Sequence, residues 1–172
     1  MERLETQRLV GHRPAADDLP GLALVVQDPR VAATLWPGKL GGPRSAVQTR
    51  ELLERFISHW EEHGFGPWIF AARDGGDPVG YAGPQWTEVE SHAEVEITYA
   101  IASARWGQGF ATEMARAAVA HAGRADLVCF TLETNIASQR VMQKAGFRYE
   151  RDFERAGRPH VLYRLGWERG WA

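Results

Sequence analysis

The feature that most constrains this chain is an alternating strand pattern that runs into a glycine-rich turn and then into a helical pattern. Apolar residues occupy every second position from Ala93 to Ile101, and glutamates and Thr98 fall between them, so this strand is expected to have one polar face. The turn 105–111 follows, and small and apolar residues then recur at helical spacing to about Ala122. A strand, a tight turn and a helix in this order require a layered fold.

The remaining elements are predicted from the same two periodicities. Further strands are expected at 6–14, 67–73, 79–86, 126–132, 147–153 and 160–165, and further helices at 22–27, 45–63 and 135–144. Pro29 is interpreted as a break in secondary structure after the first helix. A Gly/Pro-rich loop runs from Trp36 to Pro43. The order β-α-α-β-β-β-α-β-α-β-β predicts an α+β (mixed α/β) fold.

Length and charge exclude several classes of protein. The 172 residues predict one domain, spanning 1–172, and 20 Lys and Arg against 22 Asp and Glu give a net charge of −2. This charge argues against a nucleic-acid partner. No stretch approaches the roughly 18 apolar residues of a membrane span, and the charged start lacks a signal-peptide core, so we expect a cytoplasmic protein without a membrane partner.

Neither the histidines nor the single cysteine indicates a chemical site on its own. The histidines share no ligand spacing, so no metal site is predicted. The single cysteine, Cys129, lies in the apolar run Leu127–Phe130, which favours a buried core residue over a nucleophile.

The turn Gly107-Gln108-Gly109-Phe110-Ala111-Thr112 is a candidate anion site. Glycines let backbone N–H groups approach phosphate oxygens, and a helix N-terminus adds a positive partial charge. The turn lacks both the three-glycine dinucleotide spacing and the lysine of a P-loop. On spacing alone, a tight strand-to-helix turn explains it as well, and the missing lysine disfavours a simple mononucleotide-binding module.

Three segments in this order carry a family resemblance. They are the strand 95–101, the turn 106–113 and the segment 135–147, which reads Asn-Ile-Ala-Ser-Gln-Arg-Val-Met-Gln-Lys-Ala-Gly-Phe. Together they resemble the GNAT superfamily of acetyl-CoA-dependent N-acetyltransferases, and within it the Rim-type branch related to ribosomal-protein N-terminal acetyltransferases. The family's Gln/Arg-x-x-Gly-x-Gly/Ala motif corresponds to 106–111, with Trp106 in place of the leading Gln or Arg. The resemblance implies a central, mostly antiparallel sheet flanked by helices.

The resemblance also implies where acetyl-CoA binds. The pyrophosphate is expected on the amides of the turn, and the pantetheine arm alongside the end of the preceding strand. Asn135 matches the family asparagine that bonds pantetheine, although a helix N-cap explains it equally well. The residues implied as cofactor-binding are Tyr99, Ala100, Ile101, Trp106, Gly107, Gln108, Gly109, Phe110, Ala111, Thr112, Asn135, Ser138 and Arg140.

The catalytic groups depart from the family pattern. A family tyrosine that protonates the leaving thiolate would stand at Met142, which has no proton to donate. Ser138 is the substitute acid that we predict. Glu96, on the polar face of its strand, is the predicted base, and a merely half-exposed glutamate is an equally weighted interpretation. Glu133 and His92 are the alternatives.

The resemblance implies direct transfer of acetyl to a primary amine, either a protein N-terminus or a small molecule. Trp36 and Glu133 are predicted on the acceptor side, whereas Trp60 and Trp68 are more simply explained by core packing. The alternative function is a GNAT-fold sensor or scaffold that binds acyl-CoA without catalysis. Trp167 and Trp171 suggest a homodimer contact.

Overall fold

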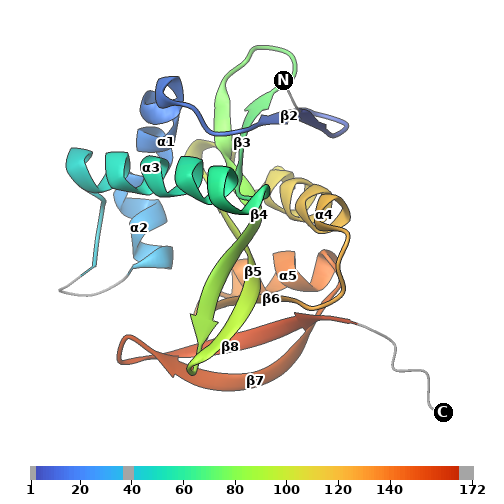
Figure 1. Ribbon diagram of the computed structural model, residues 1–172. Coiled ribbons are helices and arrows are strands. Elements are labelled where there is room, and N and C mark those ends of the chain that lie inside the picture. Colours follow the sequence, from blue (N-terminus) through green and yellow to red (C-terminus); the bar gives the residue numbers. More distant parts are fainter. Residues whose placement is uncertain (1–2, 37–40, 167–172) are drawn as a thin grey trace.

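The computed structural model describes residues 3–36 and 41–166, and these form a mixed sheet with helices on both faces (Figure 1). The strand order in the described sheet is β1-β2-β3-β4-β5-β6-β8-β7. The strands are β1 (Arg3–Glu5), β2 (Leu9–His12), β3 (Trp68–Ala72), β4 (Pro78–Val89), β5 (His92–Ile101), β6 (Leu127–Leu132), β7 (Phe147–Arg155) and β8 (Arg158–Leu165). All neighbours pair antiparallel except β5 and β6, which pair parallel, so the predicted mostly antiparallel α+β fold is confirmed.

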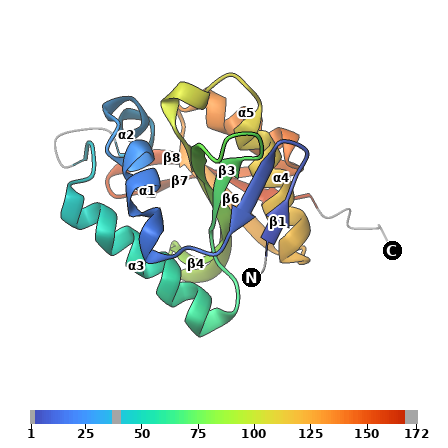
Figure 2. The same cartoon turned by 90° about the horizontal axis from the view of Figure 1, so that it is seen from above.

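The helices divide into two groups (Figures 1 and 2). One group, α1 to α3, lies over one face of the sheet, and α4 and α5 lie over the other. The helices are α1 (Leu19–Val26), α2 (Pro29–Leu35), α3 (Ala46–His63), α4 (Phe110–Ala122) and α5 (Ile136–Lys144), with 3-10 turns at Ala16–Asp18 and Ser103–Arg105. Because both faces are covered, side chains on both sides of the central strands are buried.

Strands β5 and β6 separate soon after they meet. Their parallel pairing covers only Val95 with Leu127 and Glu96 with Val128, whereas β6 continues along β8 from Val128 to Leu132. The carboxyl-terminal half of β5 therefore leaves its neighbour and opens a gap in the sheet. A gap of this kind exposes backbone groups that a ligand can pair with.

The structure corrects two predicted elements near the N-terminus. The strand predicted over 6–14 is shorter in the structure, where β2 covers Leu9–His12. It forms a hairpin with β1, which the sequence did not predict, and the Thr6 N–H donates to the Leu9 carbonyl in the connection. The sequence patterns do not predict helix α2, because Pro29 is interpreted there as the end of the preceding helix. Pro29 is in fact the first residue of α2, and the Asp28 side chain accepts from the Arg30 N–H as an N-cap.

Several predicted core residues lie in the core. Trp60 and Trp68 pack edge to face with ring centroids 4.7 Å apart, and Trp60 Nε1 donates to the Pro67 carbonyl. Cys129 is buried and its thiol donates to the Ile97 carbonyl at 3.1 Å. Trp167 and Trp171, on which the homodimer prediction rests, lie outside the described residues.

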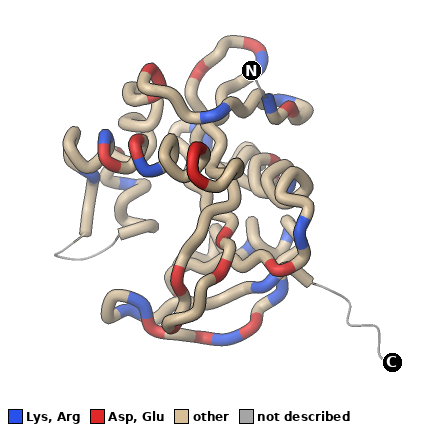
Figure 3. Tube along the Cα trace, in the orientation of Figure 1, with Lys and Arg blue, Asp and Glu red and all other residues tan. Residues whose placement is uncertain are grey.

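Charges of both signs are interspersed over the described chain (Figure 3). Along the β7–β8 hairpin they form a chain of ion pairs, because Arg164 pairs with Glu94 and Glu150, and Arg151 pairs with Glu150 and Glu90. Both of these arginines are thus paired with carboxylates.

Candidate active site

A cavity of about 460 Å³ occupies the gap where β5 leaves β6. Its lining combines the end of β5, the glycine turn, the first residues of α4 and one side of α5, and α2 closes it from the opposite side. Of the residues predicted to bind the cofactor, those that line this cavity are Tyr99, Ala100, Ile101, Trp106, Gly107, Gly109, Phe110, Ala111, Thr112, Asn135, Ser138 and Arg140. Gln108 is not in the lining, and its side chain donates to the Ala104 carbonyl instead.

The glycine turn presents unpaired backbone donors to this cavity. Gly107 and Gly109 have φ of 74° and 80°, a backbone conformation that side-chain-bearing residues rarely adopt. Gly109 is the N-cap of α4 and supplies no side-chain hydrogen bond, and the first intrahelical bond runs from the Glu113 N–H to the Gly109 carbonyl. The amides of Phe110, Ala111 and Thr112 precede that bond, so they are free to bind an anion.

Three cationic side chains add to the positive charge near the start of α4. Arg105, Arg140 and Lys144 all line the larger cavity, and Arg105 is also paired with Asp77 at 3.0 Å. The donor set of amides and cations fits the phosphates of coenzyme A. Lys144, which the family resemblance did not include among the cofactor-binding residues, is therefore one of the lining cations.

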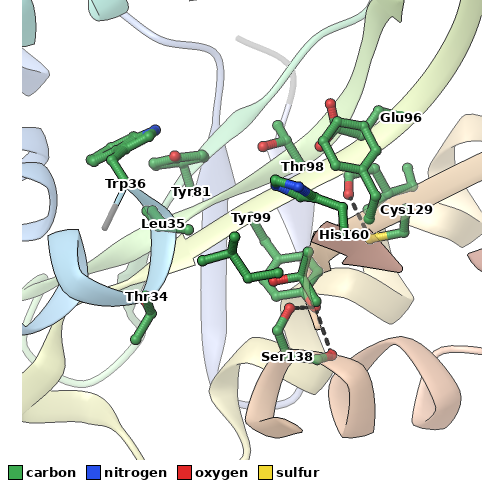
Figure 4. A pocket seen from close by; sticks show the side chains of 14 residues that line it. Thr34, Leu35, Trp36, Tyr81, Glu96, Thr98, Tyr99, Cys129, Ser138 and His160 are labelled. Carbon is green, nitrogen blue, oxygen red and sulfur yellow. Dashed lines mark hydrogen bonds between the residues drawn. The ribbon is translucent and has the colours of Figure 1, made fainter. Parts of the chain in front are cut away.

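A second cavity, of about 150 Å³, continues from the first between β5, β6 and the end of α2 (Figure 4). Its walls combine aromatic side chains with hydroxyl, carboxyl and imidazole groups. It is lined by Thr34, Leu35, Trp36, Tyr81, Glu96, Ile97, Thr98, Tyr99, Cys129, Phe130, Thr131, Leu132, Ser138 and His160. Thr34, Leu35, Tyr99 and Ser138 line both cavities, so the two spaces meet at these residues.

Glu96 brings a carboxyl group into the smaller cavity. The alternative interpretation of Glu96 as a merely half-exposed glutamate is wrong, because only 8% of its surface is exposed. Burial raises the pKa of Glu96 to about 7, against the lowering effects of a 3.4 Å hydrogen bond from Gln85 and the charge of Arg155. A carboxyl group that titrates near neutrality is suited to exchange protons with an amine.

Ser138 and Tyr99 are joined at the junction of the cavities (Figure 4). The Tyr99 hydroxyl lies 2.7 Å from Ser138 Oγ and donates to the Ser138 carbonyl at 3.0 Å. Ser138 occupies the first turn of α5, where its N–H donates to Asn135 Oδ1 at 3.2 Å. Asn135 is thus the N-cap of α5, and its Nδ2 also donates to the Thr34 carbonyl at 3.4 Å across the cleft.

The other predicted residues are placed as follows. Trp36 lines the smaller cavity and its outer face is covered by the Arg44 guanidinium, 3.8 Å from the ring centroid. Glu133 is exposed and lies outside the linings of both cavities, and so does His92 at the tip of the β4–β5 hairpin. Met142, at the family tyrosine position, is 1% exposed in the core.

Sequence reasoning missed the part of the site that α2 supplies. Val31, Thr34 and Leu35 line the larger cavity, and the last two line the smaller one as well. The pair Asp28-Pro29 followed by Arg-Val-Ala-Ala-Thr-Leu carries the signal, because an N-capping Asp and a Pro at the first helical position mark a helix start.

The described residues show neither a metal-binding cluster nor a membrane-spanning helix. Within 3–36 and 41–166, no group of three or more His, Cys, Asp or Glu is arranged to hold a metal ion. None of the helices in those ranges has both the length and the apolar character needed to cross a membrane.

Comparison with known proteins identifies the family. A family profile described as an acetyltransferase (GNAT) domain matches residues 8–148. The chain is 27% identical over 126 residues to the uncharacterized protein YkkB of Bacillus subtilis (strain 168). The aligned segment covers 71% of this chain and 73% of YkkB.

Solved structures share the fold at lower identity. A protein named for the GnaT acetyltransferase family from Bordetella pertussis superposes with a TM-score of 0.81 at 24% identity, covering 96% of this chain and 100% of the other. RimL, named as a ribosomal L7/L12 alpha-N-protein acetyltransferase and solved with coenzyme A, gives 0.73 at 19% identity, covering 94% and 96%. Because the family profile matches most of the chain, this protein belongs to the GNAT acetyltransferase domain family.

Proposed function

We propose that this protein transfers the acetyl group of acetyl-CoA to a primary amine by direct attack in a ternary complex. The observation that carries the proposal is that a cavity with free helix-start amides meets a smaller cavity with a buried carboxyl group at four shared residues. A thioester bound in the first cavity would present its carbonyl to an amine bound in the second.

The larger cavity would hold coenzyme A. The amides of Phe110, Ala111 and Thr112 would bind the pyrophosphate, and the unpaired edge of β5 at Tyr99 to Ile101 would bond the pantetheine amides. The structure of RimL with coenzyme A supports this choice of ligand for the family. Asn135 is already engaged as an N-cap, so its further bond to pantetheine stays a prediction.

Glu96 would act as the base. An incoming amine reaches the cavity as an ammonium, and it must lose a proton before its lone pair can attack the carbonyl carbon. A carboxylate with a pKa of about 7 is charged at mildly alkaline pH and basic enough to take that proton, directly or through water. Glu96 can also neutralise the ammonium as it enters, because no Lys or Arg is among the described residues that line the smaller cavity.

The acceptor would be either a protein N-terminus or a small amine. The name of RimL, a ribosomal L7/L12 alpha-N-protein acetyltransferase, supports the first, and the small volume of the acceptor cavity supports a short group beside the amine in either case. We further expect the protein to act in the cytoplasm.

The test is an assay of thiol release from acetyl-CoA against a panel of amines. The panel contains peptides with N-terminal Ala or Ser, glycinamide, benzylamine, phenethylamine and putrescine. We expect acetyl-CoA-dependent N-acetylation of at least one of them, confirmed by mass spectrometry of the product, and loss of that activity in Glu96→Gln. Tight binding of acetyl-CoA in calorimetry, with no turnover on any amine, would instead favour an acyl-CoA sensor or scaffold.

A further inference from the structure

Tyr99 places a phenol group where the two cavities meet. Its ring reaches from β5 between the sheet and α5, and its hydroxyl is within 2.7 Å of Ser138 Oγ. The sequence assigned Tyr99 only a backbone role beside pantetheine. The site that the family tyrosine would occupy is taken by Met142, so a different group must protonate the sulfur that leaves when acetyl-CoA is consumed.

Few hydroxyl groups can serve at this junction. Among the four residues shared by the cavities, Leu35 has no hydroxyl, and the Thr34 hydroxyl donates to the Val31 carbonyl at 2.8 Å within α2. Tyr99 and Ser138 remain. A phenol is a far stronger acid than an alkyl hydroxyl, so Tyr99 is the better proton donor of the two.

We propose that Tyr99 is the acid that protonates the leaving thiolate, with Ser138 as its hydrogen-bonded support. This rests on the proposed acetyl transfer. As the amine nitrogen forms its bond to the acetyl carbon, the carbon–sulfur bond breaks and its electron pair remains on sulfur. The Tyr99 O–H proton passes to that sulfur, which leaves as a thiol.

The proton inventory balances around the cycle. An ammonium loses two protons on its way to an amide: the first goes to Glu96 before attack, and the second goes to water after the carbon–nitrogen bond has formed. The proton gained by sulfur comes from Tyr99. The Ser138 hydroxyl donates to the Tyr99 oxygen and so stabilises the phenolate that forms. Glu96 then releases its proton to water and Tyr99 takes one up from water, which restores ionised Glu96 and neutral Tyr99. Each turnover of an ammonium thus releases one proton to water, and no other reactant is needed.

The surroundings of Tyr99 keep it protonated before transfer. Burial raises the pKa of Tyr99 well above its usual value, and the nearby Cys129 and Glu96 add to the effect, while the Ser138 hydrogen bond opposes it. Tyr99 is therefore a neutral donor throughout the pH range in which Glu96 becomes a base. The two residues thus hold opposite protonation states at mildly alkaline pH, as an acid and a base must.

The first test compares three variants with the best acceptor of the amine panel. Tyr99→Phe removes only the hydroxyl, and we expect kcat to fall by about 100-fold or more while the KM for acetyl-CoA changes little. Ser138→Ala should lower kcat by only about tenfold, because the phenol itself remains. Tyr163→Phe is the matched control, since Tyr163 is also buried and bonds to Gln139 on α5 at 3.2 Å, but lines neither cavity.

The second test does not depend on turnover. If the phenol contacts the sulfur, wild-type protein should bind coenzyme A more tightly than desulfo-coenzyme A in calorimetry. That preference should disappear in Tyr99→Phe and persist in Tyr163→Phe. Wild-type protein that acetylates no amine would refute the proposed function, and the binding preference would still report the contact.

Three results would overturn the assignment of Tyr99. One is a Tyr99→Phe variant with near wild-type kcat beside an inactive Ser138→Ala variant, which would make Ser138 the acid. Another is an equal loss in Tyr99→Phe and Tyr163→Phe. The third is an unchanged preference for coenzyme A over its desulfo form in Tyr99→Phe.

Discussion

The Arg8 guanidinium lies 2.6 Å from the Glu113 carboxylate and joins the β1–β2 connection to the first turn of α4. The same carboxylate accepts from the Arg8 N–H at 2.8 Å and from the Thr6 hydroxyl at 2.6 Å. Arg8 also donates to the Gln108 carbonyl at 2.9 Å and stacks on Phe110. The N-terminal hairpin therefore holds the glycine turn in the conformation that exposes its amides.

Arg8→Ala should loosen that turn. We expect several-fold weaker binding of coenzyme A in calorimetry and a loss of stability of about 1 kcal/mol, because the ion pair is partly exposed. Arg73→Ala is the control, since Arg73 pairs with Glu5 on the same hairpin and does not contact the turn. Equal effects of the two variants on coenzyme A binding would refute the role given to Arg8.

Removal of one amide from the start of α4 should weaken coenzyme A binding directly. Ala111→Pro deletes an N–H that has no intrahelical partner, at a position in the first turn where proline is tolerated. We expect a rise in the Kd of coenzyme A of about 10-fold to 100-fold, the range for one hydrogen bond to a charged group. Val47→Pro makes the same change at the matching position of α3, where the side chain is exposed, and should leave this Kd unchanged.

The pKa of Glu96 predicts the pH dependence of activity. A base must be deprotonated, so kcat/KM should fall as the pH drops through about 7. Glu96→Gln should abolish this dependence and lower kcat by about 100-fold or more near pH 8. A pH–rate profile of the wild-type protein with no inflection near neutrality, beside an active Glu96→Gln variant, would contradict the assignment.

The same residue should limit stability at high pH. Because burial raises the folded-state pKa from 4.5 to about 7, the folded protein binds more protons than the unfolded chain in this window, and stability falls as the pH rises through it. The shift corresponds to at most about 3 kcal/mol above pH 7. Denaturant unfolding at pH 5 and pH 8 should therefore show Glu96→Gln gaining on the wild type at the higher pH.

Substitution of two tryptophans should change the KM values of the two substrates independently. Trp36 lines only the smaller cavity and Trp106 only the larger one. Trp36→Ala should raise the KM for the acceptor with little effect on acetyl-CoA, and Trp106→Ala should do the reverse. Steady-state kinetics with each substrate varied in turn measure both values, and a swapped or identical pattern would disprove the division of the site.

His59 should make stability sensitive to acid. Burial lowers the pKa of His59, although the hydrogen bond from its Nδ1 to the Phe65 carbonyl at 2.7 Å opposes the shift. Its Nε2 accepts from the Trp86 N–H, which requires the neutral ring. Stability from this residue is present above pH 6.5 and lost as the pH falls through the lowered folded-state pKa. In the Glu96→Gln background, His59→Gln should flatten the decline in stability below pH 6.5, as measured by denaturant unfolding.

The sequence predicts local features well where one periodicity or one motif is strong. The alternation along β5 and the helical spacing of α4 are unambiguous, and the turn between them needs glycine for its positive φ. The environment of Glu96 could not be predicted, because alternation alone suggests a solvated face, whereas its surroundings include Val128 on β6 and Arg155 on β7, which are remote in sequence. The Tyr99–Ser138 contact spans 39 residues and depends on how α5 packs beside the separated strands.

Helix α2 contributes Thr34 and Leu35 to both cavities, and it is held to the rest of the site by Asp28 bonding Ser103 and by the Thr34 carbonyl accepting from Asn135. A ligand that binds in one cavity and orders this helix changes the free energy with which a second ligand binds in the other cavity. Acetyl-CoA and the acceptor should therefore bind with positive thermodynamic coupling, and reciprocity requires that each increases the affinity of the other by the same factor.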